Sequence, residues 1–269
     1  MSPMFIGALV LLGACTGFAA GLLGIGGGML MVPFLTALFT WQGFPNEQIV
    51  HIAIATSLAT ILFTSVSSMR AHDQRGAVLW RVVWLLAPGI LLGSLIGAQI
   101  AGRLPTFWLS VIFAILVSVS ALQMLRDRKP RATRELPRGV GMFGAGGAIG
   151  FISSLVGAGG GFISVPFMIW SNVSIHSAVA TSAALGFPIA AAGTVGYIVA
   201  GHGESGLPAG TLGFVYLPAL FAIAFASVLT APLGVRTAHT LDRRPLQRIF
   251  AVLLLLLAAY MTYRGYKAY

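Results

Sequence analysis

The chain has 269 residues, of which 57% are hydrophobic and only 8% are charged, and its mean hydropathy is +0.92. Soluble domains carry about 25% charged residues, so the composition excludes a soluble protein and predicts an all-α polytopic membrane protein rather than a barrel. The excess of 16 Lys and Arg over 6 Asp and Glu is interpreted as a topology signal and not as a nucleic-acid-binding surface. Nearly all of the chain is needed for membrane spans.

The first apolar stretch, Met4 to Phe39, is too long for one span and contains a glycine cluster from Gly24 to Gly28. One span takes about 20 residues, and each Gly in a helix interior costs about 1 kcal/mol relative to Ala. We therefore predict a helical hairpin with a long arm to about Leu23 and a short arm from about Met29. Pro33 fits the first turns of that second arm better than a helix interior.

The rest of the chain is predicted to hold six further spans, a second broken stretch and one basic linker. In chain order these are spans at Ile49–Met69, Val78–Ala101 and Phe107–Leu125, the linker 126–138, the broken stretch Gly139–Trp170, and spans at His176–Ala200, Ala209–Val235 and Ile249–Tyr263. The predicted organisation is a first transmembrane repeat over 1–125, a cytoplasmic linker over 126–138, and a second repeat over 139–269.

The two halves resemble each other in sequence. The segment SLVGAGGGFISVPF, at 154–167, matches GLLGIGGGMLMVPF, at 21–34, with four Gly and the Val-Pro-Phe at a constant offset of 133. Each half also has an Ala-Thr-Ser step, at 55–57 and at 180–182. The sequence therefore predicts two repeats, each built from a Gly-broken hairpin and three transmembrane helices.

The distribution of basic residues predicts the orientation. If each broken stretch returns to its own side, 13 Lys and Arg face the cytoplasm and three, Arg103, Arg264 and Lys267, face outside. If each broken stretch crosses once, the numbers are 11 and 5. The positive-inside rule favours the first arrangement. It places both termini outside and makes the halves inverted repeats, a recurrent transporter plan.

The glycine clusters are the predicted binding site. A broken helix at membrane depth exposes N–H and C=O groups, which are tolerated only where protein or a polar cavity receives them, and two breaks in matching places mark a transporter's binding site. Gly turns and helix N-termini attract anions, and nearby hydroxyls can donate hydrogen bonds. The candidate substrate-binding residues are Gly24, Gly26, Gly27, Gly28, Thr56, Ser57, Gly157, Gly159, Gly160, Gly161, Thr181 and Ser182.

Ordinary structural roles stay open for these residues. The glycines are alternatively close-packing residues at helix crossings, and the hydroxyls alternatively bond to their own helices. His51 and His176, which open matching spans, are candidates for pH sensing or gating, with interfacial caps as the alternative. No Asp, Glu, Lys or Arg falls in the middle of a predicted span, so no acid-based proton relay is visible. No cofactor or metal site is expected.

The paired Gly motifs, each followed by Val-Pro-Phe, and the paired Ala-Thr-Ser steps are similar to the TauE/SafE family of sulfite-exporter-like membrane proteins. The resemblance covers essentially the whole chain. It implies transport of sulfite, sulfonates such as sulfoacetate, or other sulfur-containing anions, and it implies that the Gly motifs and Thr-Ser steps line the path. Within the motif, Ile25 differs from Ala158 and Gly21 from Ser154, so the two half-sites need not be equivalent.

The expectation is a multi-pass secondary transporter of the cell inner membrane. It would move a small anionic substrate by alternating access, with membrane lipid as its other partner. An anion channel and a membrane assembly or scaffold protein stay open as alternatives. A membrane enzyme is disfavoured because Cys15 has no evident catalytic partner in the sequence and the His residues lack metal-ligand spacing.

Overall fold

The computed structural model describes residues 2–23, 27–125, 135–237 and 243–267. Helices dominate these residues, and seven of the helices are long and apolar enough to cross a membrane. The elements are α1 Pro3–Leu23, α2 Gly28–Trp41, α3 Ile49–Asp73, α4 Trp80–Ala101, α5 Thr106–Leu125, α6 Val140–Val156, α7 Gly161–Trp170, α8 Ile175–Ala200, β1 Thr211–Leu212, β2 Val215–Tyr216, α9 Leu217–Thr237 and α10 Arg243–Lys267. The predicted all-α polytopic fold is confirmed.

Both long apolar stretches are broken at their glycine clusters. Helix α1 ends at Leu23 and α2 begins at Gly28, while α6 ends at Val156 and α7 begins at Gly161. Gly27, Gly157 and Gly160 have φ angles of 66°, 68° and 76°, a left-handed conformation that disfavours any residue with a Cβ. The predicted candidates Gly24 and Gly26 lie outside the described residues.

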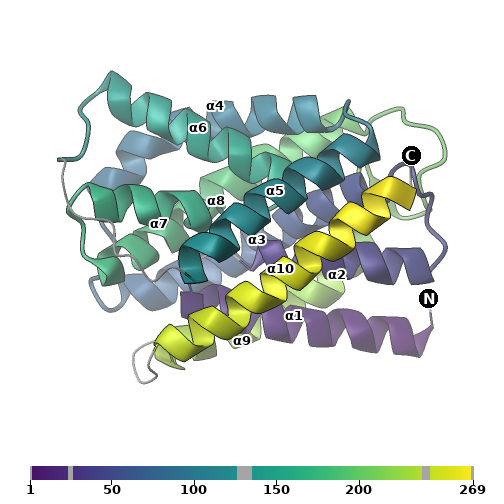
Figure 1. Ribbon diagram of the computed structural model, residues 1–269, viewed down its shortest axis with the longest axis horizontal. Coiled ribbons are helices and arrows are strands. Elements are labelled where there is room, and N and C mark those ends of the chain that lie inside the picture. Colours follow the sequence, from purple (N-terminus) through teal and green to yellow (C-terminus); the bar gives the residue numbers. More distant parts are fainter. Residues whose placement is uncertain (1, 24–26, 126–134, 238–242, 268–269) are drawn as a thin grey trace.

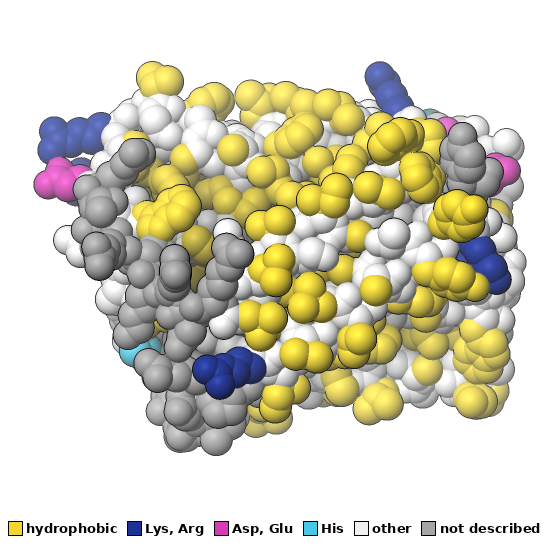
Figure 2. Space-filling model, in the orientation of Figure 1, with side chains coloured by type: hydrophobic (Ala, Val, Ile, Leu, Met, Phe, Trp, Pro, Cys, Tyr) yellow, Lys and Arg dark blue, Asp and Glu magenta, His cyan; other side chains and the backbone are white. Residues whose placement is uncertain are grey.

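The two hairpins open toward opposite ends of the molecule (Figure 1). The α1–α2 pair opens toward the end that holds both termini and the α4–α5 turn, and the α6–α7 pair opens toward the end with the α3–α4 connection and the C-terminal ends of α5 and α9. Figure 2 shows hydrophobic side chains across the middle of one face, with Lys and Arg at its two ends. Which end faces the cytoplasm, and whether the halves are inverted repeats, stay predictions.

The two halves interlock through close helix crossings. Helix α1 packs along α9, and α6 packs along α4. A Cβ added at Gly21 would lie 2.0 Å from the Ala231 carbonyl oxygen, and one added at Gly93 would lie 2.1 Å from the Gly147 carbonyl oxygen. Small residues at such crossings let helix backbones approach closely in a membrane. Close packing is therefore the role of these glycines, which lie outside the two broken segments.

One predicted span has the wrong start. The segment from Ala209 was expected to be helical, but Thr211–Leu212 and Val215–Tyr216 pair as an antiparallel β-hairpin, and α9 begins only at Leu217. Gly210 and Gly213 take φ angles of 89° and 53°, which a helix does not allow. Periodicity cannot distinguish a short buried strand from the start of a helix. The last helix is also longer than the predicted Ile249–Tyr263.

Candidate functional site

The two glycine turns lie against each other in the buried core. A Cβ added at Gly28 would be 2.1 Å from the Gly157 carbonyl oxygen and 2.8 Å from the Ala158 Cα. The Ser57 hydroxyl donates a 2.8 Å hydrogen bond to the same Gly157 carbonyl. The structure therefore brings together three residues that the sequence singled out in three separate segments, Gly28, Ser57 and Gly157.

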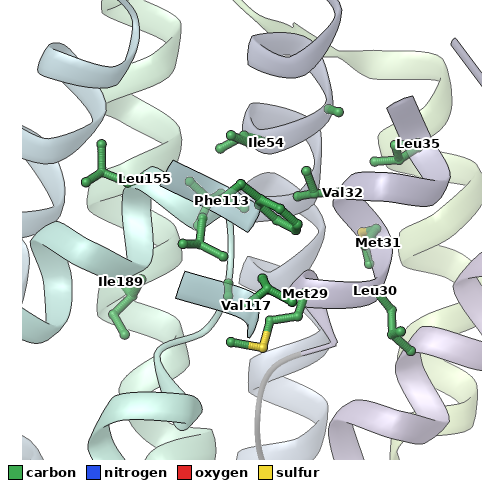
Figure 3. Packing of buried hydrophobic residues seen from close by; sticks show 14 of the residues in the cluster. Met29, Leu30, Met31, Val32, Leu35, Ile54, Phe113, Val117, Leu155 and Ile189 are labelled. Carbon is green, nitrogen blue, oxygen red and sulfur yellow. The ribbon is translucent and has the colours of Figure 1, made fainter. Parts of the chain in front are cut away.

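Apolar side chains surround this contact. Val32 of α2 and Ile54 of α3 are the nearest neighbours of a Cβ added at Gly157, and Figure 3 shows them with Met29 of α2 and Leu155 of α6 among the buried apolar side chains. All four are buried, with at most 7% of their surface exposed. The described polar groups of the turns therefore lie among buried apolar side chains.

The short helices α2 and α7 both begin at these turns. Their N-cap residues are Gly27 and Gly160, and no side chain caps either N-terminus. The first N–H groups of a helix have no partner within the helix and carry a partial positive charge. None of the buried side chains in the described part of the chain is Asp, Glu, Lys or Arg. The centre of the bundle therefore offers neutral hydrogen-bond donors to an anion, without a fixed charge.

A closed cavity adjoins the second turn. Its wall is formed by Ala20 of α1, Ile61, Thr64, Ser65 and Ser68 of α3, Gly159 of the turn, and Ser182, Ala183 and Gly186 of α8. Its volume is about 10 Å³, which is about the room for one water molecule. Four of its lining residues carry hydroxyls, although most of the cavity surface is apolar. Of the predicted site residues, Gly159 and Ser182 line it.

Two buried hydroxyls beside the second turn lack hydrogen-bond partners among the described residues, those of Ser68 and Ser153. Ser68 lines the cavity. The Ser153 Oγ lies 3.0 Å from the position that a Cβ at Gly160 would take. A buried hydroxyl without a partner lowers the stability of the protein by about 1–3 kcal/mol. A polar ligand that hydrogen-bonds to these two hydroxyls would remove this cost.

The sequence analysis missed the hydroxyls of α3 beyond Ser57. The signal was present, because Thr56, Thr60, Thr64 and Ser68 recur at intervals of four residues and so share one face of a helix. Thr60 bonds back to the Thr56 carbonyl, and Thr64 lies 2.7 Å from the Ser227 hydroxyl. Ser68 is the member of this series that faces the cavity without a protein partner in the described chain.

The two predicted threonines connect the halves of the molecule. The Thr56 hydroxyl accepts a 3.0 Å hydrogen bond from the Tyr216 N–H, and the Thr181 hydroxyl accepts a 3.0 Å bond from the Leu79 N–H. Tyr216 immediately precedes α9, and Leu79 immediately precedes α4. These two bonds attach the residue that precedes each helix to the opposite half of the molecule. Neither threonine lines the cavity at the second turn.

The two predicted histidines occupy different environments. His51 is buried, its Nε2 lies 2.9 Å from the Leu104 carbonyl oxygen, and its ring stacks on Phe214 with a centroid separation of 5.2 Å. His176 is exposed in the first turn of α8. Neither histidine lines the cavity, so they do not form a matched pair at the site. Their role in pH sensing stays a prediction.

Comparison with known proteins agrees with this architecture. The sequence profile of the family described as "Sulfite exporter TauE/SafE" matches residues 9–261. A "Probable membrane transporter protein" of Haemophilus influenzae is 36% identical over 258 residues, which cover 96% of this chain and 98% of the relative. A relative from Bacillus subtilis, "Probable membrane transporter protein YunE", is 27% identical and covers 96% of this chain and 97% of its own length.

A third relative, a "Probable membrane transporter protein" of Xylella fastidiosa (strain 9a5c), is 28% identical over 95% of this chain and 94% of its own length. No solved structure matches the chain. The profile match extends across both broken hairpins and nearly the whole bundle, and these relatives are similar over nearly their full lengths. The chain therefore belongs to the sulfite exporter TauE/SafE family, and is a membrane transporter.

Proposed function

We propose that this protein is a secondary transporter that moves a small sulfur-containing anion across the cell inner membrane by alternating access. Sulfite, sulfoacetate and other organosulfonates are the proposed substrates. The observation that carries the proposal is the contact between the two glycine turns, at Gly28 and Gly157, in a buried core without Asp, Glu, Lys or Arg among its described residues. Broken helices at membrane depth are typical of transporter binding sites.

The chemistry of the site supports an anion. Partial positive charge at the two N-termini and the hydroxyls of Ser68 and Ser153 attract negative charge without fixing it in place. A site without a fixed cation holds its ligand weakly enough to release it, which transport requires. The preference for sulfur rests on the family alone, whose description names sulfite.

The proposed binding position is the cavity at the second turn, next to Gly159. A cavity with room for about one water molecule is too small for a sulfur oxyanion with four non-hydrogen atoms. Binding therefore requires the helices around the cavity to move apart, and the present conformation corresponds to a closed state. In this proposal, α7 and the adjoining part of α8 move relative to α3, and the substrate enters from one side at a time.

Replacing Ser68 by alanine is expected to weaken substrate binding without lowering the stability of the protein. The hydroxyl is buried without a partner, so its loss should leave the empty protein as stable as before or stabilise it by up to about 1–3 kcal/mol. The substrate would lose one hydrogen bond, so KM should rise roughly two- to tenfold, corresponding to about 0.5–1.5 kcal/mol. The measurements are thermal unfolding of the purified protein and uptake of labelled sulfite and sulfoacetate into proteoliposomes.

Ser120→Ala is the matched control. Ser120 is also buried, but its hydroxyl bonds back to the Leu116 carbonyl within α5, so its removal should not change KM. Accumulation of the anion against its gradient would distinguish a transporter from a channel. If Ser68→Ala and Ser120→Ala leave uptake equally unchanged, the substrate does not bind at this cavity.

A further inference from the structure

An open groove runs along α3, on the opposite face of that helix from the closed cavity. Phe63, Val66 and Arg70 line the groove, whereas Ile61, Ser65 and Ser68 line the cavity, and a rotation of about 100° per residue sets the two groups on opposite sides. The groove is about 570 Å³ in volume, within the range of roughly 300–1,000 Å³ found for small-molecule sites. It is therefore a second site, separate from the proposed transport path.

The walls of the groove are apolar and face outward from the bundle. Phe63 of α3 is 44% exposed and Phe187 of α8 is 42% exposed, and Val228 and Pro232 of α9 form the opposite wall. The hydroxyl of Ser67, which also lines the groove, donates a 2.9 Å bond to the Val228 carbonyl. Since this polar group already has a partner, the walls offer only hydrophobic contact.

One end of the groove is basic. Arg70 and Gln74, one helical turn apart, line it and are exposed. The Arg70 side chain has neither a hydrogen bond nor an ion pair among the described residues. Its neighbours are engaged elsewhere, because Asp73 accepts a 2.7 Å bond from the Trp80 Nε1 and Arg75 donates a 3.1 Å bond to the Val235 carbonyl. Within the described part of the chain, no acidic or polar partner therefore competes with an external anion for Arg70.

We propose that this groove binds one anionic phospholipid, with its phosphate at Arg70 and Gln74 and an acyl chain along Phe63, Val66 and Phe187. An apolar groove that ends in a guanidinium without a partner in the described chain matches a molecule with one hydrophobic and one anionic part. The end that carries Arg70 is the end that the basic residues predict to be cytoplasmic, and anionic lipids concentrate in that leaflet. A free inorganic anion would leave the apolar walls unused.

The test measures lipid binding to the purified full-length protein by native mass spectrometry. Phosphatidylglycerol and phosphatidylcholine with identical acyl chains are compared, and the expected preference for phosphatidylglycerol is about fivefold, as one Arg near a membrane surface provides. Arg70→Gln should abolish the preference, and Arg70→Lys should largely keep it. Arg248→Gln is the matched control, since Arg248 is exposed in the second turn of α10, a helix that begins at the same end (Figure 1), and does not line the groove.

Val66→Trp, which fills the groove, should reduce binding of both lipids, and monodisperse gel filtration of each variant confirms its fold. Equal binding of the two lipids by the wild type, or an equal loss in Arg70→Gln and Arg248→Gln, would overturn the proposal. Competition by millimolar inorganic phosphate would indicate a small-anion site in its place. Self-association that Val66→Trp abolishes would show that a second copy of the chain occupies the groove. Failure of any of these arms leaves the proposed transport path unaffected, because the cavity lies on the other face of α3.

Discussion

Gly28→Ala is expected to reduce transport at least tenfold. The new Cβ would lie 2.1 Å from the Gly157 carbonyl oxygen and 2.8 Å from the Ala158 Cα, so the two glycine turns must separate at the backbone level. Alanine is otherwise the better helix former by about 1 kcal/mol, and the loss can therefore be attributed to the contact between the turns. The measurement is the initial rate of sulfite or sulfoacetate uptake in proteoliposomes, normalised to the amount of protein.

Gly144→Ala is the matched control, because a Cβ at Gly144 in α6 has no neighbour within 4 Å. We expect normal uptake from it and stability that is equal or higher. If Gly28→Ala fails to fold, Ser57→Ala provides a milder test, since it removes only the hydrogen bond to the Gly157 carbonyl. The initial rate of uptake is then expected to fall roughly two- to tenfold, because the bond contributes about 0.5–1.5 kcal/mol. Normal transport by Gly28→Ala at normal stability would contradict the account.

Replacing both Thr56 and Thr181 by valine is expected to destabilise the protein strongly. Each substitution leaves a backbone N–H, that of Tyr216 or Leu79, without the hydroxyl that accepts its bond. A buried donor without a partner costs about 1–3 kcal/mol. The Tyr216 bond is buried and the Leu79 bond is partly buried, and the two sites share no partner, so the double variant should lose at least about 1–3 kcal/mol and up to about 6 kcal/mol. The thermal unfolding midpoint should fall accordingly, while KM of the remaining folded protein should not change.

The serine variants Thr56→Ser and Thr181→Ser keep the hydroxyl and should keep most of the stability. This expectation differs from the one that the sequence alone supports, in which the threonines donate to the substrate and valine raises KM roughly two- to tenfold through a lost bond of about 0.5–1.5 kcal/mol. A rise in KM at unchanged stability would show that the threonines bind substrate and would refute their role in joining the halves.

Much of the fold could be predicted because its strongest signals are local. Glycine clusters inside charge-free runs predict broken helices, and both breaks occur there, between Leu23 and Gly28 and between Val156 and Gly161. The predicted start of α9 is wrong because the residues from Thr211 to Tyr216 are apolar enough to fit either a buried strand or a helix. Their hairpin depends on the positive φ angles of Gly210 and Gly213, which composition does not specify.

The candidate site was harder to predict because its geometry depends on contacts between distant segments. The motif repeats identified Gly28 and Gly157, which do meet, and Ser182, which lines the cavity. Repeats cannot say which way a side chain faces, so Thr56 and Thr181 were interpreted as donors to a substrate although they accept bonds from the backbone. Ser68 and Ser153 lie outside the repeated motifs, and only their burial without partners draws attention to them.

The most direct test of the central claim is the accessibility of a cysteine at the cavity. The chain has one cysteine, the exposed Cys15, so Ser182→Cys in a Cys15→Ser background gives a single reporter that lines the cavity. A membrane-impermeant anionic thiol reagent is applied to either side of oriented vesicles, with and without sulfite or sulfoacetate. Alternating access predicts modification from both sides, protection by the transported anion, and loss of transport after modification. Absence of modification from either side during active transport, or modification that the transported anion does not slow, would contradict the account.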